Sequence, residues 1–336
     1  MKLLLENWQR YLLTESYILD EDFFESSIQQ LFDKLKAFGD STWIFFDTET
    51  TGFKPESAQL TEIGAISAMP DNWQFTAVEA KQGIFYDKIK LNPETLAGFE
   101  ASDDPAVKYP LELTRYGMKD IEYREKYPKG KPDEVDVIKE FFVYVKSQPR
   151  PVLIAQNAEF DINFVETRAN FYITRTLEEL RFKEAEREKL ELDELPTDAI
   201  ENEIQHLEGT ISVLSANLRN YPIFDTMMLI KLWHNSLIKT LADSGDERAK
   251  TILQAITRTG KFGDYVTASM GPVSKAYEIS TDEWHNALAD VKMMMEMTKV
   301  IFMALQESSD VDISKYQGRT AWGLRKKKRG YHRSDK

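Results

Sequence analysis

Four acidic residues and one histidine stand where strands are expected to end or helices to begin. Asp47 and Glu49 lie two residues apart at the end of the apolar run WIFF, so a strand would project both carboxylates to one face. Two like charges this close repel each other unless a cation lies between them, and hard carboxylate oxygens suit Mg²⁺ or Mn²⁺. The pair therefore predicts a divalent-metal site, although a strand entering a polar turn explains it equally well when it is taken alone.

Asp161, Asp290 and His285 complete the set. Asp161 follows the short strand VLIAQN among apolar residues, where an unpaired charge is costly, although a carboxylate that caps the following helix is an alternative. His285 comes just before the last helix, and a lone histidine is more often structural than catalytic. Asp290 lies against an inward-facing apolar stripe and needs a partner there; the stripe is Ala287, Val291, Met294, Thr298, Ile301 and Leu305.

Taken together and in this order, the motifs FDTETTG, NAEFD and HNALAD resemble those of the DEDDh 3′-to-5′ exonucleases, a group of the ribonuclease H-like superfamily. The first motif matches Phe46 to Gly52, and the second matches Asn157 to Asp161 with Phe164. The third matches His285 and Asp290 at the family's five-residue offset. The segment LTEIGAI resembles the family's second strand, and residues 223–226 resemble its Asp-Thr strand, so the resemblance spans roughly residues 42–306.

This resemblance implies two divalent cations, Mg²⁺ or Mn²⁺. Asp47 is expected to bridge both ions, Glu49 and Asp290 to complete the nucleophile-side ion, and Asp161 to hold the leaving-group-side ion. His285 is expected to deprotonate the attacking water, and the products to be nucleoside 5′-monophosphates.

The residues that the resemblance places at the terminal nucleotide are Thr50, Thr51, Tyr116, Asn157, Phe160 and His285. The sequence departs from the family at Gln156, where many members have histidine, and at Tyr116-Gly117-Met118, where a His-Gly-Ile triplet is common. Both departures concern substrate contacts, and all five residues of the chemistry are present.

The 3′ end of DNA, single-stranded in particular, is the favoured substrate, and a 3′-to-5′ exoribonuclease is the alternative. The sequence contains no clear reader of the 2′-hydroxyl that would separate the two. A binding module that keeps the fold without catalysis is a non-enzyme alternative, and the loss of metal ligands would be its mark.

Apolar runs at 41–53, 60–69 and 83–91 predict an antiparallel meander, and a helix at 133–147, the strand VLIA and a further helix then predict α/β units. The expected fold is α/β: a ribonuclease H-like mixed sheet flanked by helices. Residues 175–218 hold twelve Asp/Glu and five Lys/Arg and predict an inserted acidic helical hairpin. A packed structural role for this hairpin is favoured over a role in binding a protein partner or clamping DNA. A loop is expected over 258–273.

The predicted organisation is an N-terminal helical extension over 1–40, the exonuclease domain over 41–314 and a basic tail over 315–336. The whole chain carries a net charge of −13, yet its last 22 residues hold nine Lys/Arg and one Asp, which predicts either a contact to the nucleic-acid backbone or a disordered solubilising end. The 336 residues contain no cysteine and no apolar run that could span a bilayer. Both features favour a cytoplasmic protein without membrane attachment.

Overall fold

The computed structural model describes residues 37–71, 74–77, 83–93, 132–260, 263–280 and 286–307. These residues form two compact units: the described residues within 39–226 and 286–295 make up the first, and those within 37–38, 227–280 and 296–307 make up the second. All but the last four residues of the predicted N-terminal extension, and the whole basic tail, lie outside the described residues. The domain bounds taken from the sequence stay a prediction.

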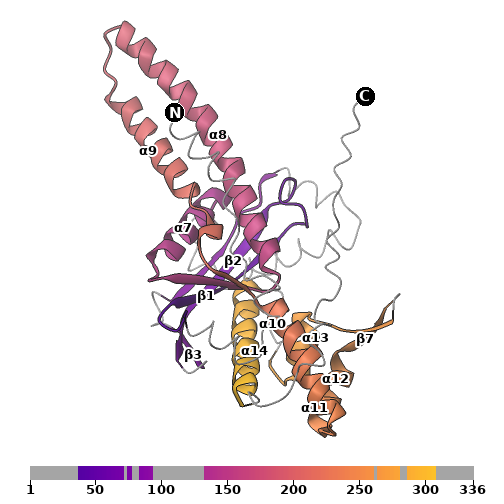
Figure 1. The fold of residues 1–336 in the computed structure, drawn as a ribbon. Coiled ribbons are helices and arrows are strands. Elements are labelled where there is room, and N and C mark those ends of the chain that lie inside the picture. Colours follow the sequence, from indigo (N-terminus) through magenta and orange to yellow (C-terminus); the bar gives the residue numbers. More distant parts are fainter. Residues whose placement is uncertain are drawn as a thin grey trace, which may run out of the picture. The chain divides into compact units, whose positions relative to one another are not determined.

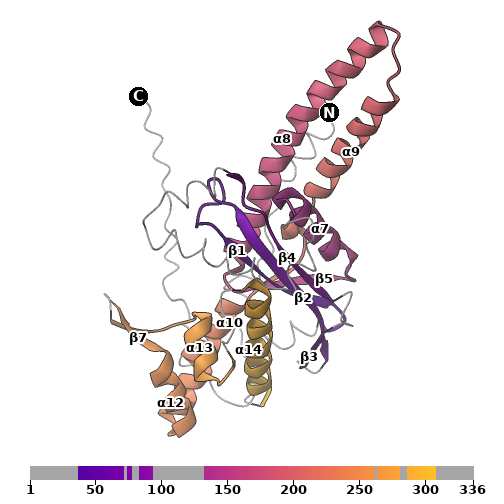
Figure 2. The same cartoon turned by 180° about the vertical axis from the view of Figure 1, so that it is seen from behind.

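A mixed sheet forms the centre of the first unit (Figures 1 and 2). Its strands follow the order β3-β2-β1-β5-β6, with β4 also paired to β2. The pairs of β2 with β1, β3 and β4 are antiparallel, whereas β1–β5 and β5–β6 are parallel. The strand bounds are Thr42–Thr50 (β1), Leu60–Asp71 (β2), Gln74–Ala77 (β3), Ile84–Lys88 (β4), Pro151–Ala155 (β5) and Ile223–Asp225 (β6). The predicted meander followed by α/β units is confirmed; β3 was not expected.

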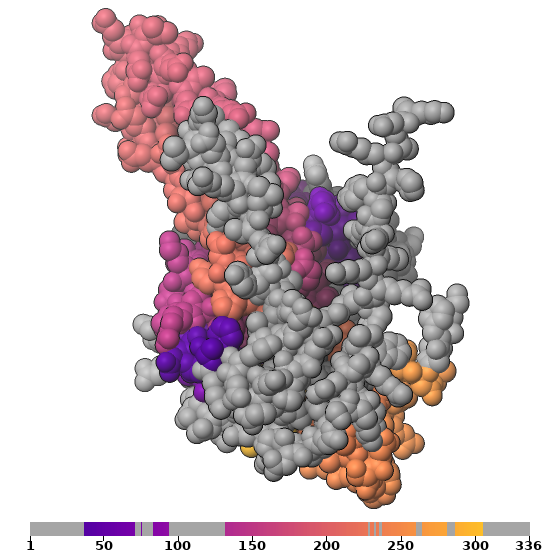
Figure 3. All heavy atoms as spheres, in the orientation of Figure 1, coloured from indigo at the N-terminus to yellow at the C-terminus, as the bar shows by residue number. Residues whose placement is uncertain are grey.

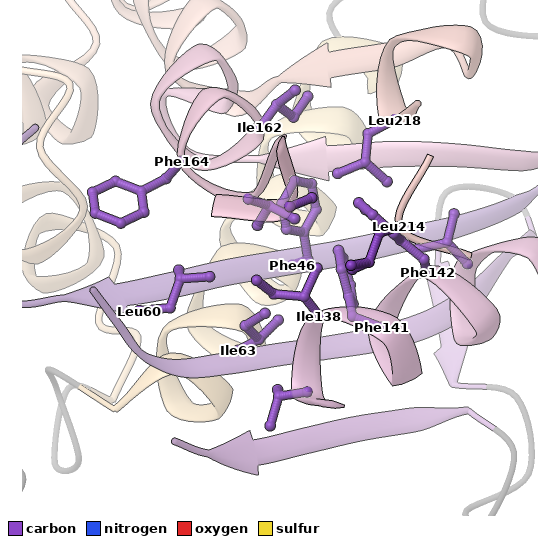
Figure 4. Packing of buried hydrophobic residues seen from close by; sticks show 14 of the residues in the cluster. Phe46, Leu60, Ile63, Ile138, Phe141, Phe142, Ile162, Phe164, Leu214 and Leu218 are labelled. Atoms are coloured by element: carbon purple, nitrogen blue, oxygen red, sulfur yellow. The ribbon is translucent and has the colours of Figure 1, made fainter. Parts of the chain in front are cut away.

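The core of this unit lies between the sheet and helices α7 (Glu134–Ser147) and α8 (Ala158–Leu192). Residues 43–46 of β1 are fully buried, as expected for a central strand that is covered on both faces. Figure 4 shows Phe46 of β1 and Ile63 of β2 close to Ile138 and Phe141 of α7. The rings of Phe46 and Phe141 lie 5.6 Å apart. This packing holds the end of β1 rigidly in place.

A buried ion pair ties α8 to the rest of the core. Arg168 donates to both oxygens of Glu134, the first residue of α7, over 3.0 and 2.7 Å. Glu134 also accepts hydrogen bonds from the backbone N–H of Leu60 and the hydroxyl of Tyr172, each over 2.8 Å. One carboxylate therefore joins the start of β2, the start of α7 and the base of α8.

The predicted hairpin is present, but its first helix starts far earlier than residue 175. Helix α8 runs unbroken for 35 residues, because no glycine or proline interrupts it, and α9 (Asp198–Leu214) returns beside it. The turn between them contains Pro196, as predicted. Near the middle, Lys183 of α8 pairs with Glu203 of α9 over 2.7 Å. In the space-filling view of Figure 3 the far ends of the two helices form a single arm.

The second unit contains short helices and a β-hairpin. Its elements are most of α10 (Thr226–Leu232), a π-helix (Trp233–Ile238), α11 (Lys239–Asp243), α12 (Glu247–Ile256), β7 (Thr257–Gly260), β8 (Gly263–Val266) and α13 (Met270–Ala276). The expectation of a loop over 258–273 was wrong, because β7 and β8 pair there and α13 begins at Met270. Among the described residues, none of the helices combines the length and apolarity needed to cross a membrane.

Candidate active site

The first two acids of the site stand at the carboxyl end of β1. Asp47 and Glu49 point to the same face and lie opposite Gly64 and Glu62 of β2. The register shifts between Glu49 and Thr50, so the regular pairing ends directly after the second acid. The fully buried residues before Asp47 fix the strand, and both carboxylates are therefore held at the edge of the core.

Asp290 comes to this pair from a distant part of the sequence. It lies in the first turn of α14 (Ala287–Glu307) and is buried, with 5% of its surface exposed. Carboxylate oxygens of Asp47, Glu49 and Asp290 all lie within 4.8 Å of one another. Three such oxygens can hold one hard divalent cation.

Asp161 reaches the site from the first turn of α8. Thr48, which stands between the two acids of β1, donates to Asp161 Oδ1 from its hydroxyl over 2.6 Å and from its backbone N–H over 3.2 Å. The side chain is buried, with 2% of its surface exposed. Both of these bonds come from β1, and a hydrogen bond from the backbone of Asp161 itself, in the first turn of α8, adds to them.

The electrostatics of these acids reflect their crowding. Burial, together with the neighbouring charges of Asp161, Glu49, Asp290 and Glu62, raises the pKa of Asp47 well above its usual value. Burial, followed by the charges of Asp290, Glu62 and Asp161, raises the pKa of Glu49 to about 8. Glu49 therefore retains its proton near neutral pH unless a cation displaces it.

The pKa of Asp161 is also raised, to about 7, with burial as the largest cause. The two hydrogen bonds from Thr48 lower it, because they favour the ionised carboxylate, and the nearby charge of Asp225 raises it. The pKa of Asp161 therefore depends on the hydrogen bonds from Thr48 as well as on the charge of Asp225.

The predicted substrate contacts are only partly described. Asn157 precedes α8 in the left-handed conformation (φ 64°), and its backbone N–H donates to Asp225 over 3.1 Å. Phe160 is half-buried and packs on Phe164 at 5.6 Å between ring centroids. Thr50 Oγ1 donates to the carbonyl of Gly52 over 2.8 Å, and the N–H of Thr51 donates to the carbonyl of Gln59 over 2.9 Å.

Tyr116 and His285 lie outside the described residues. The role of His285 as a base and the substrate contact of Tyr116 therefore stay predictions.

Two acids near the site were not selected from the sequence. Glu62 of β2 lies opposite Glu49, and Asp225 ends β6 and contacts the turn before Asp161. Both had a recognisable signal. Glu62 is a charged residue inside the apolar strand LTEIGAI, and Asp225 follows IF at a strand end much as Asp47 follows IFF.

Comparisons with known proteins give distant relatives. No family model matches the chain. A DNA polymerase III of the PolC type from Clostridium perfringens is 28% identical over 126 residues, which cover 38% of this chain and 7% of that protein.

Solved structures similar to the chain include those of exonuclease I. The E. coli exonuclease I complex with a dT13 oligonucleotide has a TM-score of 0.42 and 14% identity, and the match covers 81% of this chain and 43% of that one. A complex titled ExoI/SSB-Ct gives a TM-score of 0.41 at 13% identity, with the same coverage. The chain spans less than half the length of the exonuclease I structures. We base the functional proposal on the carboxylates themselves.

Proposed function

We propose that the chain is a metal-dependent exonuclease that removes nucleotides from the 3′ end of DNA. The observation that carries the proposal is the meeting of Asp47, Glu49 and Asp290 within 4.8 Å, with Asp161 anchored beside them by Thr48. These are the four acids that the motifs selected in advance from three separate parts of the sequence. DNA is proposed over RNA because the matched relative is named as a DNA polymerase.

The donor set fits Mg²⁺ or Mn²⁺, because it consists of carboxylate oxygens and the described chain around it offers no thiolate. Burial first, and then the repulsion between the acids, raise the pKa values of Asp47 and Glu49, and a bound cation would offset both effects. A bound pair of divalent cations supplies a nucleophile at neutral pH and stabilises the incoming and departing oxygens. Asp47, Glu49, Asp161 and Asp290 would hold them.

The chain's own residues then orient the substrate and move the proton. Backbone groups near Thr50 and Thr51, together with Asn157 and the ring of Phe160, would hold the terminal nucleotide by hydrogen bonds and stacking. His285 would accept the proton of the attacking water. The product is a nucleoside 5′-monophosphate, and the shortened strand can re-enter the site.

The test uses single- and double-stranded DNA and RNA, each labelled at the 5′ or the 3′ end, with Mn²⁺. Mononucleotides released from the 3′ end of DNA, identified by mass, are the expected result, and Asp290→Asn should release none. Faster release from RNA would establish the exoribonuclease alternative. Tight nucleic-acid binding without any release, by a protein that also binds Mn²⁺, would contradict hydrolysis and favour a binding module.

The role of His285 has its own test. His285→Ala should lower the rate by roughly 10²- to 10⁴-fold, the usual contribution of a positioned base, and should leave Mn²⁺ binding unchanged. Calorimetric titration with Mn²⁺ separates the two roles. If the substitution eliminates metal binding, His285 is a ligand and the assignment as a base is wrong.

A further inference from the structure

The start of α14 is fastened to the sheet by one acid of β2. Glu62 Oε2 accepts hydrogen bonds from the backbone N–H of Ala287 over 3.3 Å, from the side-chain amide of Asn286 over 3.4 Å and from the hydroxyl of Tyr86 over 3.2 Å. Its other oxygen, Oε1, pairs with Lys88 of β4 over 3.2 Å. Both oxygens of Glu62 are therefore engaged by groups of β2's neighbours and of the start of α14.

Asn286 completes the fastening from the helix side. Its side-chain oxygen accepts from the N–H of Ala289 over 3.1 Å, and its carbonyl accepts from the N–H of Asp290 over 2.9 Å. Its amide also donates to the hydroxyl of Tyr86 over 2.6 Å. The first N–H groups of a helix have no acceptor inside the helix. Here Glu62 of β2 accepts from the N–H of Ala287, and Asn286 accepts from the N–H of Ala289.

The backbone of β2 approaches this helix end closely. A Cβ built on Gly64 would lie 2.7 Å from both Ala287 C and Leu288 N, distances that real side chains do not reach. Gly64 and Glu62 are two residues apart and share one face of β2. The glycine lets the helix end reach the sheet, and the glutamate holds it there.

We propose that Glu62 is a positioning residue that sets the distance of Asp290 from Asp47 and Glu49. Asp290 lies three residues after Ala287, less than one helical turn from the hydrogen bond to Glu62. The inference rests on the proposed function for its catalytic consequence, but the fastening itself can be tested without hydrolysis.

The main alternative is that Glu62 acts only through its negative charge, which would attract a cation wherever α14 lay. Two substitutions separate the alternatives. Glu62→Gln and Glu62→Ala both remove the charge, but only glutamine keeps an oxygen that can accept from the N–H of Ala287. If Glu62 positions the helix, Glu62→Gln should retain a higher Mn²⁺ affinity than Glu62→Ala. If Glu62 acts only through its charge, the two variants should have the same Mn²⁺ affinity.

Calorimetry with Mn²⁺ and hydrogen exchange of the amides at 287–290 give the readouts. In Glu62→Ala we expect Mn²⁺ affinity to fall by about 10- to 100-fold, as for other partners of metal ligands, with faster exchange at these amides and a fall in kcat larger than any rise in KM. Glu62→Gln should recover much of this loss. Asn286→Ala, which keeps every acid, should show the same faster exchange and weaker Mn²⁺ binding.

The control is Glu134→Gln, which alters another buried carboxylate that joins helices to β2 without adjoining Asp290. Its Mn²⁺ affinity in the folded protein should equal that of the unaltered chain. Equal losses in Glu62→Gln and Glu62→Ala, or unchanged exchange and affinity in both Glu62→Ala and Asn286→Ala, would overturn the proposal. Loss of amide protection in a chain that hydrolyses no nucleic acid would instead retain the positioning role and refute the proposed function.

Discussion

Thr48 stands between the two acids of β1 and determines the state of a third acid, Asp161. Its hydroxyl and its N–H both donate to Asp161 Oδ1. Burial raises the pKa of Asp161 and these bonds lower it, and the net result is a pKa of about 7. A donor that favours the ionised form makes a carboxylate a better ligand at neutral pH. The side chain of Thr48 therefore links β1 to α8 and also lowers the pKa of Asp161.

Thr48→Val tests this control, because valine keeps the shape and the backbone N–H but loses the hydroxyl. The pKa of Asp161 should rise further, so Mn²⁺ binding at pH 7 should weaken and recover as the pH is raised. Titrations of Mn²⁺ at pH 6, 7, 8 and 9, each with the unaltered chain for comparison, provide the measurement. A loss of affinity that is the same at every pH would show that the hydroxyl acts by geometry alone.

The sequence predicted the acids of the site far better than it predicted their supports. Asp47, Glu49, Asp161 and Asp290 could be selected because each is a charge beside an apolar run at a strand end or helix start. Glu62 was missed because its partners, Ala287 and Asn286, lie more than 200 residues away. The charge inside the apolar strand LTEIGAI marks Glu62 as unusual, but a bond of that sequence separation leaves no local pattern that identifies its partner.

At the scale of elements, the contact of β2 with the first turn of α14 brings the last acid into place. Gly64→Ala should push this helix end outward, because the added Cβ meets backbone atoms that cannot rotate away. We expect a loss of about 1–3 kcal/mol in the free energy of unfolding, as for other overpacked cores, together with weaker Mn²⁺ binding. Denaturant unfolding and calorimetry measure the two effects.

Gly209→Ala is the matched control, because a Cβ at that position in α9 meets nothing within 4 Å. It should leave Mn²⁺ affinity unchanged and should stabilise the helix slightly. An unchanged Mn²⁺ affinity in Gly64→Ala would mean that the helix end can shift without moving Asp290.

Element types were predictable where the apolar pattern was strong, and element ends were less so. Helix α7 and strand β5 lie where their patterns indicate, because buried residues set their periods. Helix α8 was divided in two because the composition becomes acidic near residue 175, yet composition does not break a helix. Residues 257–266 pair as β7 and β8, although their glycines suggested a loop.

At the scale of the molecule, the crowded acids couple stability to pH. The pKa of Glu49 lies near 8 in the folded chain against about 4.5 when it is unfolded, so between these values the folded state binds more protons. The free energy of unfolding then decreases as the pH rises through this window, and the loss is complete above the folded value.

We therefore expect the melting temperature of the metal-free protein to fall between pH 5 and pH 8, within the window that the raised pKa of Glu49 defines. Mn²⁺ should restore it at pH 8, because the cation replaces the protons. Glu49→Gln should flatten this slope when melting is followed by calorimetry in EDTA. If the melting temperature depends on pH equally in the unaltered chain and in Glu49→Gln, groups other than Glu49 cause the pH dependence.

The hairpin arm should be separable from catalysis. Replacing residues 184–202 with a short glycine-serine turn keeps the pair of Lys183 and Glu203 and removes only the far ends of α8 and α9. Mn²⁺ affinity and the rate on short oligonucleotides should remain unchanged, because Asp161 lies at the opposite end of α8. A rate that falls on short substrates would place the arm in substrate binding.

The continuity of α8 also limits how chains of this kind can diverge. Each residue added to a helix turns everything beyond it by about 100°, so an insertion between Asp161 and Leu180 would rotate the whole arm against the packed base. Beyond Leu180, length can change if α8 and α9 gain or lose residues together in steps of about seven, which restores the facing side chains. Related chains should therefore differ in the reach of the arm while the first six turns of α8 keep one length.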